Sequence, residues 1–352
     1  DSTEGYAELI APIVEDKPFI HSLTFEGGLR YANYSTSGNA WTWKVGGSWE
    51  PISSLKIRGM YTKAVRAPNI GELFDPRVVA LSNLAADPCQ GQITNAAGTN
   101  YNAALAGSAA LRNLCIATGV PSGVLGTGAI RSPPAGQVQS VQGGNPDLDP
   151  EKATTFTVGA VFQPDFVRNL TLSVDYYHIK VKDAISRPSV LDITDGCYRT
   201  TLNPTLSASS PACALVGRNG AGRLDGAAVD TPGVTLPLSN SGLIVTSGID
   251  LSLNFRADLG FAMFSYGLNG NYTFQSKFQA TPLSVNRECV GFYSSSCSPI
   301  QPEFTWNQRT TLSFDPVDVS LFWRHISKAV VEPGSPVLLP AFREIPAFDY
   351  FD

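Results

Sequence analysis

The sequence is poor in charge and in long apolar runs, and each shortage excludes a class of protein. Charged residues are 16% of the 352, whereas about 25% is usual for a soluble domain. Aromatic residues, at 10%, are too frequent for a disordered chain. The net charge of -5 argues against a nucleic-acid-binding protein, which would present a basic surface. No apolar run reaches the roughly 18 residues of a membrane helix, which leaves membrane-spanning strands open because they show only alternation.

Histidine is also scarce, and this predicts that the chain is not an enzyme and holds no metal or cofactor. The three histidines, His21, His178 and His325, are scattered, and no Cys-x-x-Cys pair occurs. Zinc sites need such ligands at close spacing, and no Ser-His-Asp order is present. Asp175 and Asp250 fall on separate expected strands, where pairing with arginine is favoured over acid and base roles.

Cysteine is sparse but paired along the chain. The six cysteines fall into three near pairs within Gly-, Pro- and Ser-rich stretches, and we expect the disulfides Cys89–Cys115, Cys197–Cys213 and Cys289–Cys297. Local disulfides indicate an oxidising compartment such as the periplasm or the cell surface. The alternative is a set of unpaired thiols in a cytosolic protein.

What the sequence has in abundance is two-residue alternation, which predicts an all-β chain. In the stretch SGIDLSLNFRADLGFAMFSYGLNGNYTF, residues 247–274, apolar and polar residues alternate on both sides of one short break, as in a β-hairpin. Similar runs predict about eleven strands. They begin near Tyr6–Pro12 and end at Ile345–Phe351.

The connections between these strands alternate in length. Short ones such as EPISS and DPVD are interleaved with long segments at about 67–150, 186–243, 275–303 and 327–344, and all three cysteine pairs fall in the long ones. Short periplasmic turns and long extracellular loops are typical of a transmembrane antiparallel β-barrel. A soluble β-sandwich is the alternative, but it has no reason to separate its loops by length.

The two faces of the predicted strands suit different environments, one lipid and the other water. All five tryptophans lie on the apolar face, where rings at a lipid interface keep an apolar body in lipid and a polar edge in water. Charges on the opposite face could hardly be satisfied in a protein core, so we expect a hydrated lumen there. The predicted lumen-facing residues are Glu26, Arg30, Lys44, Arg58, Asp175, Asp250, Arg256, Arg309 and Arg324.

Two segments carry a resemblance to a known family. LKIRGMYTKAVRAPNIGELFDP, residues 55–76, contains an Arg-Ala-Pro-Asn segment between a strand and a long loop, and residues 145–186 open with the motif Asn-Pro-x-Leu-x-Pro-Glu-Lys and continue as a hairpin. Both resemble TonB-dependent outer-membrane receptors, and the likeness runs through most of residues 5–185.

The resemblance implies a barrel of about 22 strands with its lumen closed by a plug domain. Residues 1–352 would supply about half of those strands and no plug. The chain begins without Met and ends inside an expected strand, so we expect a piece of a longer protein. The implied partners are outer-membrane lipid, the protein's own plug domain, a small solute, and TonB with ExbB and ExbD acting through the plug; nucleic acid is not among them.

In the implied function, a receptor in the Gram-negative outer membrane imports a scarce solute of the siderophore, oligosaccharide, peptide or cobalamin type with TonB-supplied energy. Arg66, Asn69 and Glu72 are candidates for plug or ligand contact. The alternative for this segment is that Pro68, Ile70, Leu73 and Phe74 pack the base of the loop. A passive porin and a secreted, disulfide-stapled β-rich adhesin remain alternative functions, and an outer-membrane enzyme is a distant fourth.

Overall fold

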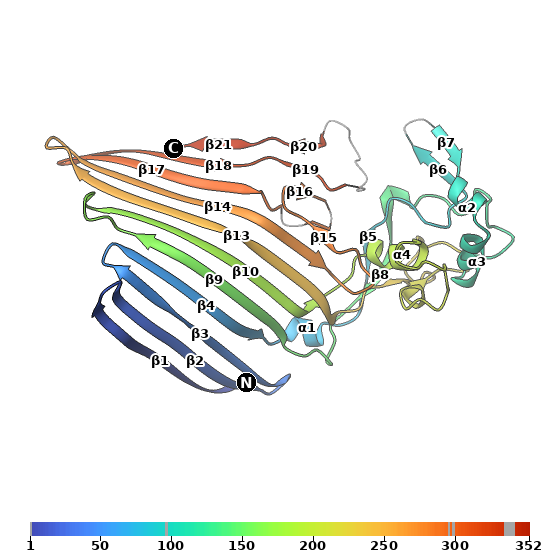
Figure 1. Cartoon of the computed structure of the whole chain (residues 1–352). Coiled ribbons are helices and arrows are strands. Elements are labelled where there is room, and N and C mark those ends of the chain that lie inside the picture. Colours follow the sequence, from blue (N-terminus) through green and yellow to red (C-terminus); the bar gives the residue numbers. More distant parts are fainter. Residues whose placement is uncertain (1, 96–97, 295, 298–299, 334–341) are drawn as a thin grey trace.

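The computed structural model describes residues 2–95, 98–294, 296–297, 300–333 and 342–352. Its largest element is one curved antiparallel sheet, drawn across the left of Figure 1, with irregular segments gathered at one end. The sheet has the strand order β1-β2-β3-β4-β9-β10-β13-β14-β17-β18-β21, and β15 pairs with β14 beside this path. The bounds are β1 Ser2–Lys17, β2 Ile20–Tyr34, β3 Gly38–Ile52, β4 Leu55–Arg66, β9 Glu151–Phe162, β10 Leu170–Ser186, β13 Ser239–Asp258, β14 Met263–Gln279, β15 Arg287–Glu288, β17 Phe304–Phe314, β18 Val317–Ile326 and β21 Phe348–Phe351.

The all-β class and the count of about eleven strands are therefore confirmed. Each strand of the path pairs antiparallel with its neighbours, and among the described residues no pairing joins β1 to β21. Pairing on every internal strand satisfies the backbone donors and acceptors that hydrocarbon cannot satisfy. The sheet is thus the open wall of a barrel.

The connections at the two ends of the strands differ in length. One end holds residues 18–19, 53–54, 163–169, 259–262 and 315–316, and the other holds 35–37, 67–150, 187–238, 280–303 and 327–347. β13 begins at Ser239 rather than at Leu243, and β14 continues to Gln279 rather than stopping at Phe274. These strand ends lack strict apolar and polar alternation, so the sequence pattern alone does not mark them as strand.

The long segments form structure of their own. They contain helices α1 Ile70–Phe74, α2 Ala103–Gly107, α3 Ala109–Ala117 and α4 Val190–Tyr198, with 3-10 turns η1 Pro134–Gly136 and η2 Cys213–Leu215. They also contain strands β5 Val78–Asn83, β6 Gln92–Asn95, β7 Gly98–Tyr101, β8 Gln137–Gln142, β11 Val216–Gly217, β12 Gly233–Thr235, β16 Phe292–Tyr293, β19 Ala329–Val331 and β20 Glu344–Ile345. No helix in the described part of the chain is long and apolar enough to cross a membrane.

We call the described residues of 67–150 and 187–238 the loop cap. They lie together at one end of the sheet (Figure 1), joined by a small sheet in which β12 from the second segment pairs with β8 from the first. The main buried hydrophobic cluster lies here, with Leu105, Leu114, Ile130, Val138 and Val234 almost wholly buried. The cap is therefore a folded unit with its own core.

The main sheet has a different kind of surface. None of its five tryptophans is buried; Trp41 is 54% exposed and Trp49 is 40% exposed. No second sheet stacks on these rings within the described residues. This excludes the β-sandwich, in which the indoles would be enclosed between two sheets. A continuous apolar face left open in this way suits a hydrocarbon environment.

Candidate functional site

The nine predicted lumen residues all lie on one face of the sheet. Directly opposed residues of antiparallel strands share a face. The registers pair Arg58 with Gly159, Gly159 with Asp175, and Asp175 with Asp250. The same rule links the whole set, Glu26, Arg30, Lys44, Arg58, Asp175, Asp250, Arg256, Arg309 and Arg324. Trp43 and Trp49 lie on the opposite face. The polar face is thus a single surface; that it lines a lumen remains a prediction.

Some basic side chains on the polar face pair with carboxylates, and others do not. Arg58 donates two hydrogen bonds to Asp175, at 2.9 and 2.8 Å. Arg30 and Lys44 form ion pairs with carboxylates of β1. Within the described residues, Arg256, Arg309 and Arg324 have no carboxylate partner. Two of them lie over the ring of Phe322 instead, Arg309 at 4.9 Å and Arg324 at 5.5 Å from its centroid.

A hollow of about 440 Å³ lies beside Arg324. Its polar lining includes Asp250, Asn269, Asn271 and Asn307, and its apolar lining includes Leu251, Trp306 and Ile326. Asn271 donates a hydrogen bond of 2.8 Å to Asp250, which fixes the carboxylate that lies directly opposite Asp175. Amide, carboxylate and guanidinium groups together can both donate to and accept from a polar ligand.

The base of the first long segment is held by Arg66. Its guanidinium bonds the carboxylate of Glu72 on α1 at 2.9 and 3.0 Å and that of Glu151 on β9 at 2.6 and 3.2 Å. Asn69 caps α1 by accepting a hydrogen bond from the Glu72 backbone N–H. Burial acts to raise the pKa of Glu72, but the bonds from Arg66 and Asn69 outweigh it and lower the pKa.

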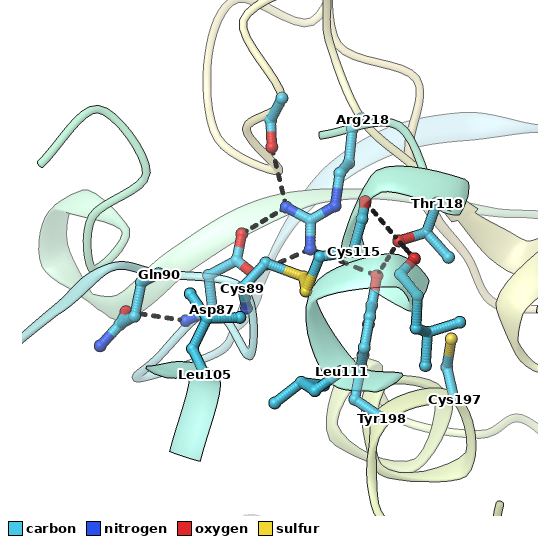
Figure 2. The surroundings of a disulfide bond; sticks show 12 residues. Asp87, Cys89, Gln90, Leu105, Leu111, Cys115, Thr118, Cys197, Tyr198 and Arg218 are labelled. Atoms are coloured by element: carbon cyan, nitrogen blue, oxygen red, sulfur yellow. Dashed lines mark hydrogen bonds and ion pairs between the residues drawn. A yellow bond between two sulfur atoms is a disulfide. The ribbon is translucent and has the colours of Figure 1, made fainter. Parts of the chain in front are cut away.

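A buried ion pair stands at the centre of the loop cap (Figure 2). Arg218 donates to both oxygens of Asp87, at 2.6 and 2.8 Å, and their side chains are 0% and 3% exposed. Arg218 also donates to the Tyr198 hydroxyl, and Asp87 accepts the backbone N–H of Cys89. Burial alone would lower the pKa of Arg218, but the Asp87 carboxylate raises it overall. The pair joins the two segments of the cap.

A second charged cluster links the cap to the remaining loops. Arg287 bonds Asp192 at 3.2 Å and Glu332 at 2.8 Å, so three separate connections meet at one guanidinium. Asp195 on α4 is buried, and burial raises its pKa to about 6, although Arg199 and Arg287 act against this rise. The cap therefore contains a carboxyl group whose pKa lies above the usual range for aspartate.

Comparison with known families decides the identity of the chain. Residues 5–328 match the family described as TonB dependent receptor-like, beta-barrel. The chain belongs to this family. Its members are outer-membrane receptors that transport solutes, not enzymes. The resemblance read from residues 55–76 and 145–186 is thereby confirmed.

Solved structures show the same fold for this TonB-dependent receptor chain. The siderophore receptor PirA from Acinetobacter baumannii matches over 99% of the chain with a TM-score of 0.56 and 16% identity. The ferric enterobactin receptor PfeA from Pseudomonas aeruginosa, in complex with enterobactin, matches over 93% with a TM-score of 0.55 and 14% identity. The chain spans 38% of PirA and 34% of PfeA. No curated protein matches the sequence.

The structure places the receptor's predicted contact residues in structural roles without testing whether they bind ligand. Arg66, Asn69 and Glu72 are all engaged at the loop base, and their contact with plug or ligand stays a prediction. Packing of the loop base rests on Pro68 and Leu73, which are buried. The expectation that Ile70 and Phe74 also anchor it is wrong, because they are 78% and 58% exposed.

The three disulfides of the receptor are confirmed in the predicted pairing, Cys89–Cys115, Cys197–Cys213 and Cys289–Cys297. Among the described residues no group of three or more His, Cys, Asp or Glu side chains could hold a metal ion. Sequence reasoning missed the charged clusters of the cap. The sequence held one local indication of these clusters, the capping-box spacing of Ser189 and Asp192. The two residues form a capping box at the start of α4.

Proposed function

We propose that the chain forms part of a TonB-driven importer whose loop cap faces the cell exterior and captures a scarce solute. Membership of the receptor family over residues 5–328 is the observation that carries this proposal. The solute is of the siderophore, oligosaccharide, peptide or cobalamin type. The likeness to PirA and PfeA makes ferric siderophores the first class to test, although at this identity it shows the fold alone.

The geometry supports capture at one end of the sheet and passage along one face. The cap has its own core, two disulfides and the buried pair of Asp87 and Arg218, so it is built to hold a fixed shape outside the membrane. Arg256, Arg309 and Arg324, which have no carboxylate partner among the described residues, lie on the polar face along which the solute would pass. A plug domain supplied by the rest of the protein would pair with these arginines and carry the contact with TonB, ExbB and ExbD.

The test is uptake by cells that express the full-length receptor. Labelled ferric siderophores, an oligosaccharide, a peptide and cobalamin are offered one at a time to cells with and without TonB, and to cells treated with a protonophore. We expect saturable uptake of one class that is lost without TonB and lost with the protonophore. Uptake that continues without TonB would indicate a passive porin, and no uptake with binding of whole cells to a surface would indicate an adhesin.

A further inference from the structure

The small sheet of the loop cap ends in an edge strand that has only one partner. Its strand order is β11-β12-β8-β5, so β5 pairs with β8 on one side and with no described strand on the other (Figure 1). Natural edge strands usually carry a charge, a proline or a bulge that prevents another strand from pairing. The β5 sequence VVALSN has no charge and no proline, and its register with β8 has no shift. We call the side of β5 that points away from β8 the β5 edge.

The backbone groups that point to the β5 edge belong to the odd-numbered residues Val79, Leu81 and Asn83. Opposed residues of antiparallel strands alternate between pairs that exchange backbone hydrogen bonds and pairs that do not. The Leu84 N–H donates to the Gly136 carbonyl at 2.8 Å, which places the bonded pairs at the even-numbered residues of β5. The N–H and C=O groups of the odd-numbered residues therefore point away from β8, and no described backbone group bonds them.

The side chains of the odd-numbered residues are apolar and open at two positions. Val79 is 48% exposed and Leu81 is 59% exposed. The even-numbered residues face the cap core instead, because Ser82 opposes the buried Val138 and its hydroxyl lies 2.7 Å from that of the buried Ser140. A strand added at the β5 edge would pair its backbone with β5 and place alternate side chains beside Val79 and Leu81.

A free cation stands at the beginning of β5. Arg77 is exposed and makes no ion pair or side-chain hydrogen bond with any described residue. The carboxylate closest to it along the chain, Asp75, interacts electrostatically with Arg187. A strand that pairs antiparallel with β5 ends where β5 begins, so its C-terminus comes to Arg77. Guanidinium binds a carboxylate through two parallel hydrogen bonds, which suits a free peptide C-terminus.

We propose that the β5 edge captures an extended peptide by strand addition, with the C-terminal carboxylate of the peptide at Arg77. This rests on the proposed function and narrows its solute to the peptide class. The backbone groups of β5 recognise any extended peptide, whereas Val79 and Leu81 favour apolar side chains at alternate positions. A second copy of β5 fits the edge less well, because antiparallel pairing would bring its uncharged Asn83 near Arg77 and leave the guanidinium without an anion.

The test measures binding of a labelled hexapeptide, Thr-Val-Thr-Val-Thr-Val with a free C-terminus, to the full-length receptor in detergent by fluorescence anisotropy. Leu81→Pro removes one N–H that points to the β5 edge and keeps the bonds to β8, since proline is tolerated where the N–H of an edge strand faces solvent. We expect binding to weaken at least about tenfold, because a peptide carbonyl loses its donor. Leu81→Val is the matched control, which keeps the N–H and should bind within about twofold.

The carboxylate anchor is tested with the same hexapeptide amidated at its C-terminus. The wild type should bind the amide roughly tenfold more weakly than the free acid, because a charge-assisted hydrogen bond is lost. Arg77→Gln should bind both peptides with about equal affinity. This comparison needs no change within β5, so it decides the proposal even if Leu81→Pro does not fold.

Three results would overturn the proposal. The first is equal affinity of the wild type and Leu81→Pro for the hexapeptide, with heat-modified electrophoretic mobility showing that both are folded. The second is a preference of Arg77→Gln for the free acid that is as large as that of the wild type. The third is a receptor dimer that forms without peptide and that Leu81→Pro dissociates, which would assign the β5 edge to a second copy.

Uptake by cells separates this proposal from the transport proposal. TonB-dependent uptake of another solute, with no hexapeptide binding at the β5 edge, would overturn the peptide assignment and leave the transport proposal intact. Hexapeptide binding that depends on Leu81 and Arg77 supports the β5 edge, and the absence of TonB-dependent uptake of any solute would then count against the transport proposal alone.

Discussion

The ion pair between Asp87 and Arg218 provides the most direct test that the loop cap is a folded unit. We consider Arg218→Met in the full-length receptor. The side chain that is lost is 0% exposed, and its partner, 3% exposed, cannot reach water in the folded cap. Asp87 would keep only the backbone N–H of Cys89 at 2.9 Å. A buried carboxylate left without its counter-charge costs about 3–5 kcal/mol.

The double variant Asp87→Asn with Arg218→Met separates the cost of an orphaned charge from the value of the pair. Asparagine retains an acceptor for the Cys89 N–H and carries no charge. Replacing both members of a buried pair by neutral groups is often close to neutral. We therefore expect the double variant to recover at least about 2 kcal/mol relative to Arg218→Met. Arg131→Met is the matched control, because Arg131 is exposed and has no side-chain partner in the described structure.

Hydrogen–deuterium exchange of the α3 and α4 amides measures the effect, because these helices carry Cys115 and Cys197 in the same core. A loss of 3–5 kcal/mol lowers their protection factors by more than about a hundredfold, at 1.36 kcal/mol for each factor of ten. Strands of the main sheet serve as an internal reference and should not change. A fall of less than tenfold for Arg218→Met, or a double variant no better than the single one, would refute the buried pair.

Three further predictions concern other parts of the receptor. Burial raises the pKa of Asp195 to about 6, so between the unfolded and the folded pKa the folded cap holds a proton that the unfolded cap releases. Cap stability should therefore fall by up to about 3 kcal/mol as pH rises from about 3 to about 7, and Asp195→Asn should abolish the fall in α4 protection factors. Cys89→Ser with Cys115→Ser should cost the cap about 3 kcal/mol, read from α3 exchange, with unchanged sheet amides. Leu251→Arg, on the apolar face, should lower barrel insertion by about 2–4 kcal/mol in a refolding titration, whereas Ser252→Arg on the polar face should have little effect.

The main sheet could be predicted because the apolar and polar alternation that specifies it lies between neighbouring residues of the sequence. Alternation along β13 and β14 specifies both faces from neighbouring residues, and the two strands are joined by residues 259–262. The disulfides were predictable for a related reason, since each cysteine has its partner within one connection. The longest separation within a disulfide is 26 residues, for Cys89 and Cys115.

The cap interior was not predictable from the sequence, because its contacts are distant along the chain. Asp87 and Arg218 are separated by 131 residues, and neither lies in a periodic pattern.

The two parts of the receptor thus depend on different solvents for their stability. The cap buries its own apolar side chains and is cross-linked by two disulfides, so it is suited to an aqueous environment. The sheet leaves its tryptophans exposed and pairs its strands along their length, as hydrocarbon requires because it cannot satisfy an unpaired backbone group.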